Sequence, residues 1–177
     1  MSWSPLLRSQ WHRPGEPCVL CHSKAGPATD HEFVLAGTVF WGPDRYDRRV
    51  DQAYVRVAGP GNTKKCFVTN CNGNFFVRPD EYKNLKFPLL VSVERVNVPG
   101  GRGPDDNKPI ALRRMSGHIG REPSCAACHI TGLRDFGSPG QIRLFDSEAA
   151  VDAAKPSIPK DCPNDQPRVT RCPEDPL

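Results

Sequence analysis

The chain has 177 residues, of which 37% are hydrophobic and 19 are proline, and its formal net charge is +4. This length is enough for one domain with a small hydrophobic core. Lysine and arginine are interspersed with aspartate and glutamate, so the sequence lacks the basic stripe of a nucleic-acid-binding surface.

No apolar stretch reaches the length of a transmembrane helix, so no membrane span is expected. The first residues, MSWSPLLRSQWH, also lack the apolar run of a signal peptide. If the protein is exported, we therefore expect its leader to be absent from this sequence.

The central part of the chain has the pattern of short strands. Residues 1–32 are polar and rich in proline, which disfavours a long helix. From residue 33 onward, runs of β-branched and aromatic residues are separated by turn residues. Asn72-Gly73 predicts a hairpin between the third and fourth of these runs. The five expected strands are residues 33–41, 52–59, 65–70, 74–79 and 87–96.

Strands at a spacing of roughly ten residues are typical of a small antiparallel β-sandwich, so the expected fold class is mainly β. The flanking segments are expected to be loop-rich. Only short helices are predicted, at the two cysteine motifs described below and around Ser147–Ala154.

The strand segments also suggest a family. AGTVF, DQAYVRV, FVTNCNGNFFV and FPLLVSV resemble the transthyretin-like or carboxypeptidase-regulatory family of β-sandwiches. Members of that family are often accessory modules, so the resemblance implies an architecture and not a chemistry.

Two motifs, CVLCH at Cys18–His22 and CAACH at Cys125–His129, have the spacing of c-type haem attachment. Two thiols on one helical turn can form thioethers with the two vinyl groups of a porphyrin, and the next histidine then faces the iron. The motifs therefore predict two haem c groups. The expected thioether ligands are Cys18, Cys21, Cys125 and Cys128, and the expected proximal iron ligands are His22 and His129.

Haem attachment fits the motifs better than chance, a zinc ribbon or a redox pair does. Two such pentapeptides are rare by chance. A zinc ribbon normally places its two cysteine pairs about 15–20 residues apart, far closer than these two motifs, and it does not need the trailing histidines. A thioredoxin-like pair needs a βαβ setting, which the sequence does not predict.

Three histidines remain as candidates for the distal face of the irons. The segments HRPGEPCVLCH and HIGREPSCAACH both begin with a histidine ahead of the first cysteine. His118 is favoured first, His31 at the edge of the first strand second, and His12 third. His12 lies on an N-terminal arm that, if mobile, could ligate a haem in a neighbouring subunit. Met115 is a rival ligand, although packing against the porphyrin is the favoured role for it.

The other four cysteines predict two disulfides, and hence an oxidising compartment, extracellular or periplasmic. Cys66 and Cys71 flank the expected hairpin and could pair across it, but pairing with Cys162 and Cys172 is also open. We expect the last two cysteines to strap down the C-terminal tail.

These features divide the chain into a first haem-binding segment (1–32), a β-sandwich (33–98), a loop with the second haem-binding segment (99–155) and an irregular tail (156–177). Irons with both axial positions filled leave no site for a substrate, so the expected function is electron transfer and not enzymatic catalysis.

The two motifs, the shortage of other histidines and the sandwich resemble small extracellular multihaem cytochromes, some of which form filaments. The resemblance implies redox donors and acceptors as partners, with filament assembly through inter-subunit haem ligation as a hypothesis. Two alternatives stay open. One is a peroxidase-like haem enzyme with one open iron site, and the other is a docking subunit of a larger redox complex.

Overall fold

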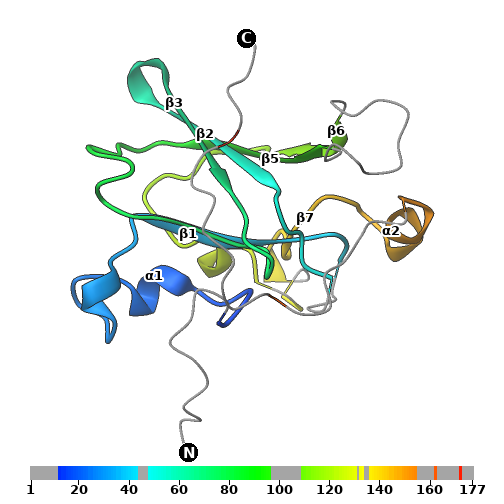
Figure 1. The fold of residues 1–177 in the computed structure, drawn as a ribbon, viewed down its shortest axis with the longest axis horizontal. Coiled ribbons are helices and arrows are strands. Elements are labelled where there is room, and N and C mark those ends of the chain that lie inside the picture. The colour runs from blue at the N-terminus through cyan, green and yellow to red at the C-terminus, as the bar shows by residue number, and fades with distance from the viewer. Residues whose placement is uncertain are drawn as a thin grey trace, which may run out of the picture.

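The computed structural model describes residues 12–43, 48–96, 109–130, 132–133, 136–154, 162 and 172. Two β-sheets face each other, and short helices lie around them (Figure 1). The three-stranded sheet has the order β4-β1-β7 and the four-stranded sheet the order β3-β2-β5-β6. The strands are β1 Leu35–Phe40, β2 Tyr54–Gly59, β3 Thr63–Val68, β4 Asn74–Val77, β5 Leu90–Val96, β6 Pro109–Arg114 and β7 Ile142–Arg143.

The helical segments are short, as expected. The two α-helices are α1 (Cys18–Cys21) and α2 (Glu148–Ala154), and the three 3-10 turns are η1 (Thr29–His31), η2 (Pro60–Asn62) and η3 (Cys125–Ala127). The predicted helices at both cysteine motifs and near residues 147–154 are therefore confirmed.

The mainly-β sandwich and its five predicted strands are confirmed, but two further strands were missed. Both come from residues 99–155, which were expected to form loops. β6 pairs antiparallel with β5 at one edge of the four-stranded sheet. β7 has only two residues and pairs parallel with β1, so its sequence carries too short a pattern to predict a strand.

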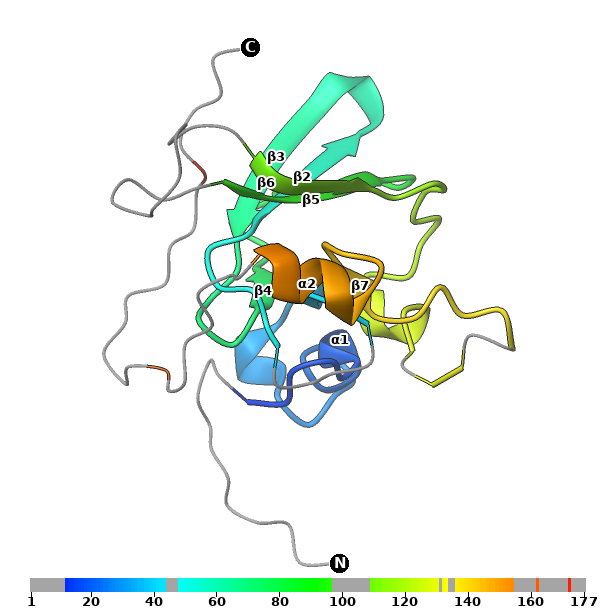
Figure 2. The ribbon, with the colours of Figure 1, turned by 90° about the vertical axis from the view of Figure 1, so that its right-hand side faces the viewer.

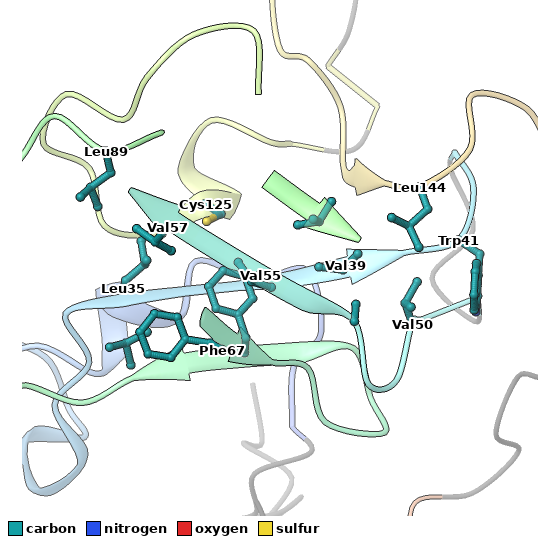
Figure 3. Close-up of a cluster of buried hydrophobic side chains, with 14 of the residues drawn as sticks. Leu35, Val39, Trp41, Val50, Val55, Val57, Phe67, Leu89, Cys125 and Leu144 are labelled. Carbon is teal, nitrogen blue, oxygen red and sulfur yellow. The ribbon is translucent and has the colours of Figure 1, made fainter. Parts of the chain in front are cut away.

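Strand β1 lies at the centre of the three-stranded sheet, and all six of its residues are buried. Alternate side chains of a strand point to opposite faces. Leu35 and Val39 pack into the core with Val55 and Val57 of β2 (Figure 3). On the other side of β1, helix α1 lies away from the four-stranded sheet, as the two views in Figures 1 and 2 agree.

The predicted hairpin between residues 65–70 and 74–79 is wrong. β3 and β4 belong to different sheets, so the Asn-Gly turn joins the two layers of the sandwich. The Gly73 N–H donates to the Asn70 carbonyl at 2.8 Å, and Gly73 has a φ of 73°. A Cβ at Gly73 would lie 2.6 Å from the Val39 carbonyl oxygen, so this turn has no room for a side chain.

The disulfides join the tail to the sandwich. Cys66 is bonded to Cys172 and Cys71 to Cys162, with Cα–Cα distances of 5.5 and 5.6 Å. The predicted strap is confirmed, whereas the favoured pairing of Cys66 with Cys71 is wrong. The chain crosses from one sheet to the other between these two cysteines, so they do not face each other as cross-hairpin partners would.

No helix in the described part of the chain is long and apolar enough to cross a membrane.

We expect non-reducing peptide mapping to recover Cys66 joined to Cys172 and Cys71 joined to Cys162. The double variant Cys71→Ser/Cys162→Ser should lose about 2–4 kcal/mol of unfolding free energy, because this bridge spans 91 residues and restricts the unfolded chain. Urea unfolding of the oxidised protein measures the loss. A peptide that joins Cys66 to Cys71 would contradict the observed pairing.

Candidate functional site

The first cysteine motif forms one helical turn. Pro17 precedes α1, where its missing N–H costs no helical hydrogen bond, and the His22 N–H donates to the Cys18 carbonyl at 2.9 Å. The chain then turns back, and the Ala28 N–H donates to the Cys21 carbonyl at 3.0 Å. A Cβ at Gly26 would lie 2.2 Å from the same carbonyl oxygen, so the return loop needs glycine there.

The His22 ring is fixed by two contacts. Its Nδ1 lies 2.8 Å from the His31 carbonyl oxygen, and Phe33 stacks on it with ring centroids 4.2 Å apart. A carbonyl only accepts hydrogen bonds, so Nδ1 carries the proton and Nε2 carries the lone pair that can bind a metal. Burial lowers the pKa of His22 below its ordinary value, which keeps the ring neutral.

The second motif repeats this arrangement. The His129 N–H donates to the Cys125 carbonyl at 2.9 Å, and the His129 Nδ1 lies 2.8 Å from the Gly140 carbonyl oxygen. Burial also lowers the pKa of His129. Metal-ligating histidines typically donate their other ring N–H to a carbonyl or carboxylate, so both rings are oriented as iron ligands would be.

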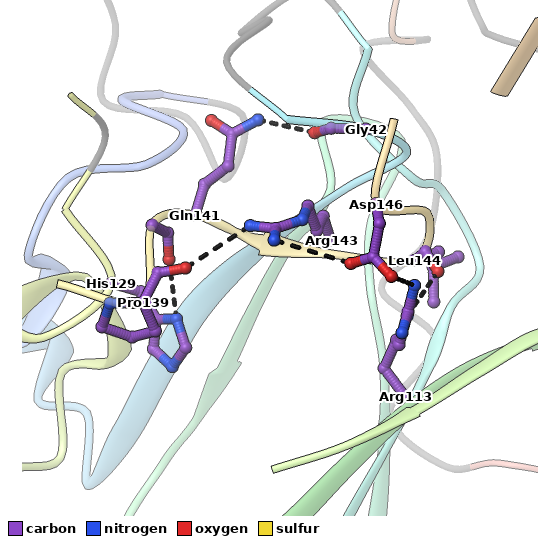
Figure 4. Close-up of polar contacts among 9 residues, drawn as sticks. Gly42, Arg113, His129, Pro139, Gln141, Arg143, Leu144 and Asp146 are labelled. Carbon is purple, nitrogen blue, oxygen red and sulfur yellow. Dashed lines mark hydrogen bonds and ion pairs between the residues drawn. The ribbon is translucent and has the colours of Figure 1, made fainter. Parts of the chain in front are cut away.

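The Gly140 carbonyl is held by the loop that follows the second motif. Ser138 Oγ accepts from the N–H groups of Ile130 and Gly140, at 2.9 and 3.1 Å, and donates to the Cys128 carbonyl at 2.8 Å. The next residue, Gln141, is buried and donates to the Gly42 carbonyl at 2.8 Å (Figure 4). The sequence did not single out Ser138, Gly140 or Gln141, because polar loop residues carry no ligand pattern.

Ion pairs fasten β7 and the residues after it. Arg113 of β6 donates to the Leu144 carbonyl at 2.8 Å and pairs with Asp146, and Arg143 reaches the Pro139 carbonyl at 3.4 Å (Figure 4). The segment that carries the Gly140 carbonyl is therefore attached to both sheets, since β7 pairs with β1 and β6 belongs to the other sheet.

Strand β1 brings the two motifs together. The Ala36 N–H donates to the Pro123 carbonyl at 3.0 Å, and Ala36 forms a parallel bridge with Ser124. Beside it, the Gly15 N–H donates to Thr38 Oγ1 at 2.8 Å. The residues just before each attachment motif thus contact β1 within three positions of each other, although about a hundred residues of chain separate the motifs.

Gly37 allows the second motif to lie close to β1. A Cβ at Gly37 would be 2.9 Å from Cys125 Cβ and 3.0 Å from its Sγ. Cys125 is buried in the core cluster beside Val57 and Leu35 (Figure 3). This packing fixes one thiol of the second motif against the sheet.

The thiols differ from those of zinc or redox sites. Burial raises the pKa of Cys18 to about 11, and burial together with the neighbouring Cys18 raises the pKa of Cys125 to about 12. Redox and zinc cysteines are thiolates, which a low pKa favours. In the described residues no three His, Cys, Asp or Glu side chains gather as a metal site, and a haem iron does not need such a group.

Apolar side chains are exposed near the attachment residues. Of the six large apolar side chains exposed in the described residues, four lie in or just after the motifs, with Leu20 71% and Phe136 84% exposed and Ile130 and Leu133 the other two. Such surface suits an apolar porphyrin as its cover. The thiols, the oriented imidazoles and this apolar surface together fit a c-type haem at each motif.

The distal candidates lie in different places. The ring of His12 is 5.7 Å from that of His22, and Asn74 donates to the His12 carbonyl at 3.1 Å, so this arm is held against β4 and is not free as the sequence suggested. His31 and His118 are exposed, and Met115 extends the pairing of β6 with β5 through its N–H to the Val91 carbonyl.

The histidines that begin the two repeated segments are not structurally equivalent. Ile119, next to His118, pairs with Leu89 in both directions at 2.8 and 2.9 Å. Among the ring pairs of the described residues, none involves His118 or His129. The resemblance seen in the sequence therefore extends to the Glu-Pro and cysteine positions but not to the leading histidine.

Comparison with known proteins gives no relative. No protein-family model matches the chain, and searches of curated proteins and of solved structures find no match. The resemblance of the sandwich to transthyretin-like modules, and of the whole chain to small multihaem cytochromes, thus stays a prediction.

We expect Gly37→Ala to lower the unfolding free energy by about 1–3 kcal/mol, because the added methyl group would overlap Cys125 and Phe75 in a packed layer. Urea unfolding measures this loss.

The matched control for this variant is Gly117→Ala, where nothing lies within 4 Å of the added Cβ, and it should stay within about 0.5 kcal/mol of the parent. Equal stability of the two variants would mean that Cys125 does not pack against β1 in this way.

Proposed function

We propose that this protein transfers electrons through two covalently attached c-type haems. The observation that carries the proposal is the shared geometry of the motifs. In each, a helical turn bears the two cysteines, and a backbone carbonyl holds the Nδ1 proton of the following histidine so that Nε2 can bind iron.

Each residue has a defined part in this proposal. Cys18 and Cys21 would hold one porphyrin by thioethers and Cys125 and Cys128 the other, with His22 and His129 as proximal ligands. When bound, the haems supply iron that accepts and releases single electrons. The chain fixes the imidazoles and, with the apolar side chains beside the motifs, limits the access of water.

The proximity of the motifs supports a relay between the two haems. Both attachment segments contact residues 36–38 of β1, and Cys18 lies close enough to Cys125 to raise its pKa. Two redox groups held this way can pass an electron between a donor and an acceptor, for which redox proteins or an extracellular acceptor are the proposed partners.

The disulfides support export as the setting of this function. Two bridges that close long loops persist in oxidising compartments, which favours an extracellular or periplasmic location. Thioether attachment also retains the cofactor outside the cell. Self-assembly into a filament stays a prediction, and negative-stain microscopy tests it.

The haem count tests the proposal directly. We expect protein matured with a haem c attachment system to keep two haems per chain after denaturation, as measured by a pyridine haemochrome assay. Cys18→Ser/Cys21→Ser and Cys125→Ser/Cys128→Ser should each keep one, because the two motifs use separate residues. A colourless parent, or a zinc-containing one, would overturn the proposal.

A peroxidase-like activity at the second motif is the other candidate. It is favoured by one observation, since no histidine ring in the described residues pairs with that of His129. High-spin haem and a rapid reaction with peroxide in Cys18→Ser/Cys21→Ser would support this candidate. A low-spin spectrum and slow reaction in the same variant would support electron transfer alone.

A further inference from the structure

We infer that His12 is the second axial ligand of the haem attached at Cys18 and Cys21, and that Asn74 is its positioning residue. The inference rests on the proposed function and extends it to the coordination of one named iron. It assigns a ligand that the repeat in the sequence left among three candidates.

His12 already lies where a sixth ligand is needed. Its ring centroid is 5.7 Å from that of His22, with an angle of 33° between the ring planes. Two imidazoles on opposite sides of one metal have centroids roughly 6 Å apart, because each metal–nitrogen bond is about 2 Å long. A small opening of this pair is therefore enough to admit the iron.

His31 is excluded by the side from which it approaches. Its own carbonyl accepts the Nδ1 proton of His22, so the backbone of His31 lies behind the proximal imidazole. A sixth ligand must come from the opposite side of the porphyrin, which the Nε2 of His22 faces. The His31 side chain is exposed and would have to pass around the porphyrin edge to reach that side.

A buried polar network holds the His12 arm on the correct side. Asn74 Nδ2 donates to the His12 carbonyl at 3.1 Å, and Thr38 Oγ1 donates to Asn74 Oδ1 at 2.7 Å. The Gly15 N–H in turn donates to Thr38 Oγ1 at 2.8 Å. Thr38 and Asn74 are only 4% and 6% exposed, and polar groups buried in a sheet are retained when their hydrogen bonds are satisfied.

The arm is shaped to make these contacts. Arg13 has a φ of 47° and Gly15 a φ of 83°, and the Glu16 N–H donates to the Arg13 carbonyl at 3.3 Å. This tight turn reverses the chain between His12 and α1, so the ring of His12 returns toward His22 while Gly15 contacts β1. The left-handed φ at Gly15 explains the glycine ahead of the first motif.

The experiment uses the haem-loaded chain with Cys125→Ser/Cys128→Ser, in which the remaining colour reports the first haem alone. Low-temperature EPR of the ferric form and carbon monoxide binding by the ferrous form are measured for the parent, His12→Ala, His31→Ala and Asn74→Ala. The parent and His31→Ala should both give a low-spin signal and exclude carbon monoxide. His12→Ala should lose the low-spin signal and bind carbon monoxide, and added imidazole should restore the low-spin form.

Asn74→Ala separates positioning from general stability. It should give a mixture of low-spin and high-spin haem that imidazole converts to low-spin, an effect that a purely structural change would not show. His12→Met gives a second check if His12→Ala folds poorly, because methionine can still ligate and should change the spectrum to that of a methionine–histidine pair.

The inference is overturned if His12→Ala stays low-spin and closed to carbon monoxide, or if His31→Ala opens the iron instead. Loss of haem from the parent in the haemochrome assay would overturn the proposed function as well. The two failures are therefore distinguishable by whether the parent is coloured.

Discussion

The close packing of both cysteine motifs on strand β1 is the constraint on which the rest of the structure depends. Residues 36–38 of this strand carry the smallest side chains in it, Ala36 and Gly37, followed by a threonine. Their size lets Ser124 pair with the strand edge and Cys125 reach the core, and Thr38 binds the arm that leads to Cys18. Larger side chains at these positions would push the motifs apart. The spacing between the two proposed haems is thus set by a strand that itself holds none of the attachment residues.

The two imidazoles depend on carbonyl groups that lie well outside the motifs. The carbonyl of His31 holds His22, and that of Gly140 holds His129. Each carbonyl is placed by its own local structure, a 3-10 turn in the first case and the Ser138 loop with β7 in the second. Both rings are buried enough for their pKa to fall, so the fold supplies neutral imidazoles with a defined tautomer. The chain resembles a scaffold in which attachment is local and orientation is tertiary.

The disulfides compensate for a small core. A chain with this much proline and modest hydrophobic content buries little apolar surface for its length, and two long-range bridges restrict its unfolded state instead. One bridge starts on β3 of the four-stranded sheet, and the other starts in the turn that leads to β4 of the three-stranded sheet. Each sheet is thereby fastened near one edge to the C-terminal tail. The same bridges agree with the oxidising setting in which haem c is attached and retained.

The sequence by itself determined what depends on local pattern. Alternating and β-branched runs predicted the mainly-β fold and five of its strands, the prolines limited helices to single turns, and the spacing of Cys18–His22 and Cys125–His129 predicted the two attachment motifs. The tertiary structure decided what depends on segments that meet from far apart in the chain. It paired Cys66 and Cys71 with the tail, because the intervening turn crosses between sheets, and it placed β6 and β7 as sheet edges. It also chose His12 over His118 as the neighbour of an attachment histidine, since Thr38 and Asn74 hold one arm while Leu89 holds the other. Such choices follow from packing and hydrogen bonds between distant residues, which no local pattern encodes.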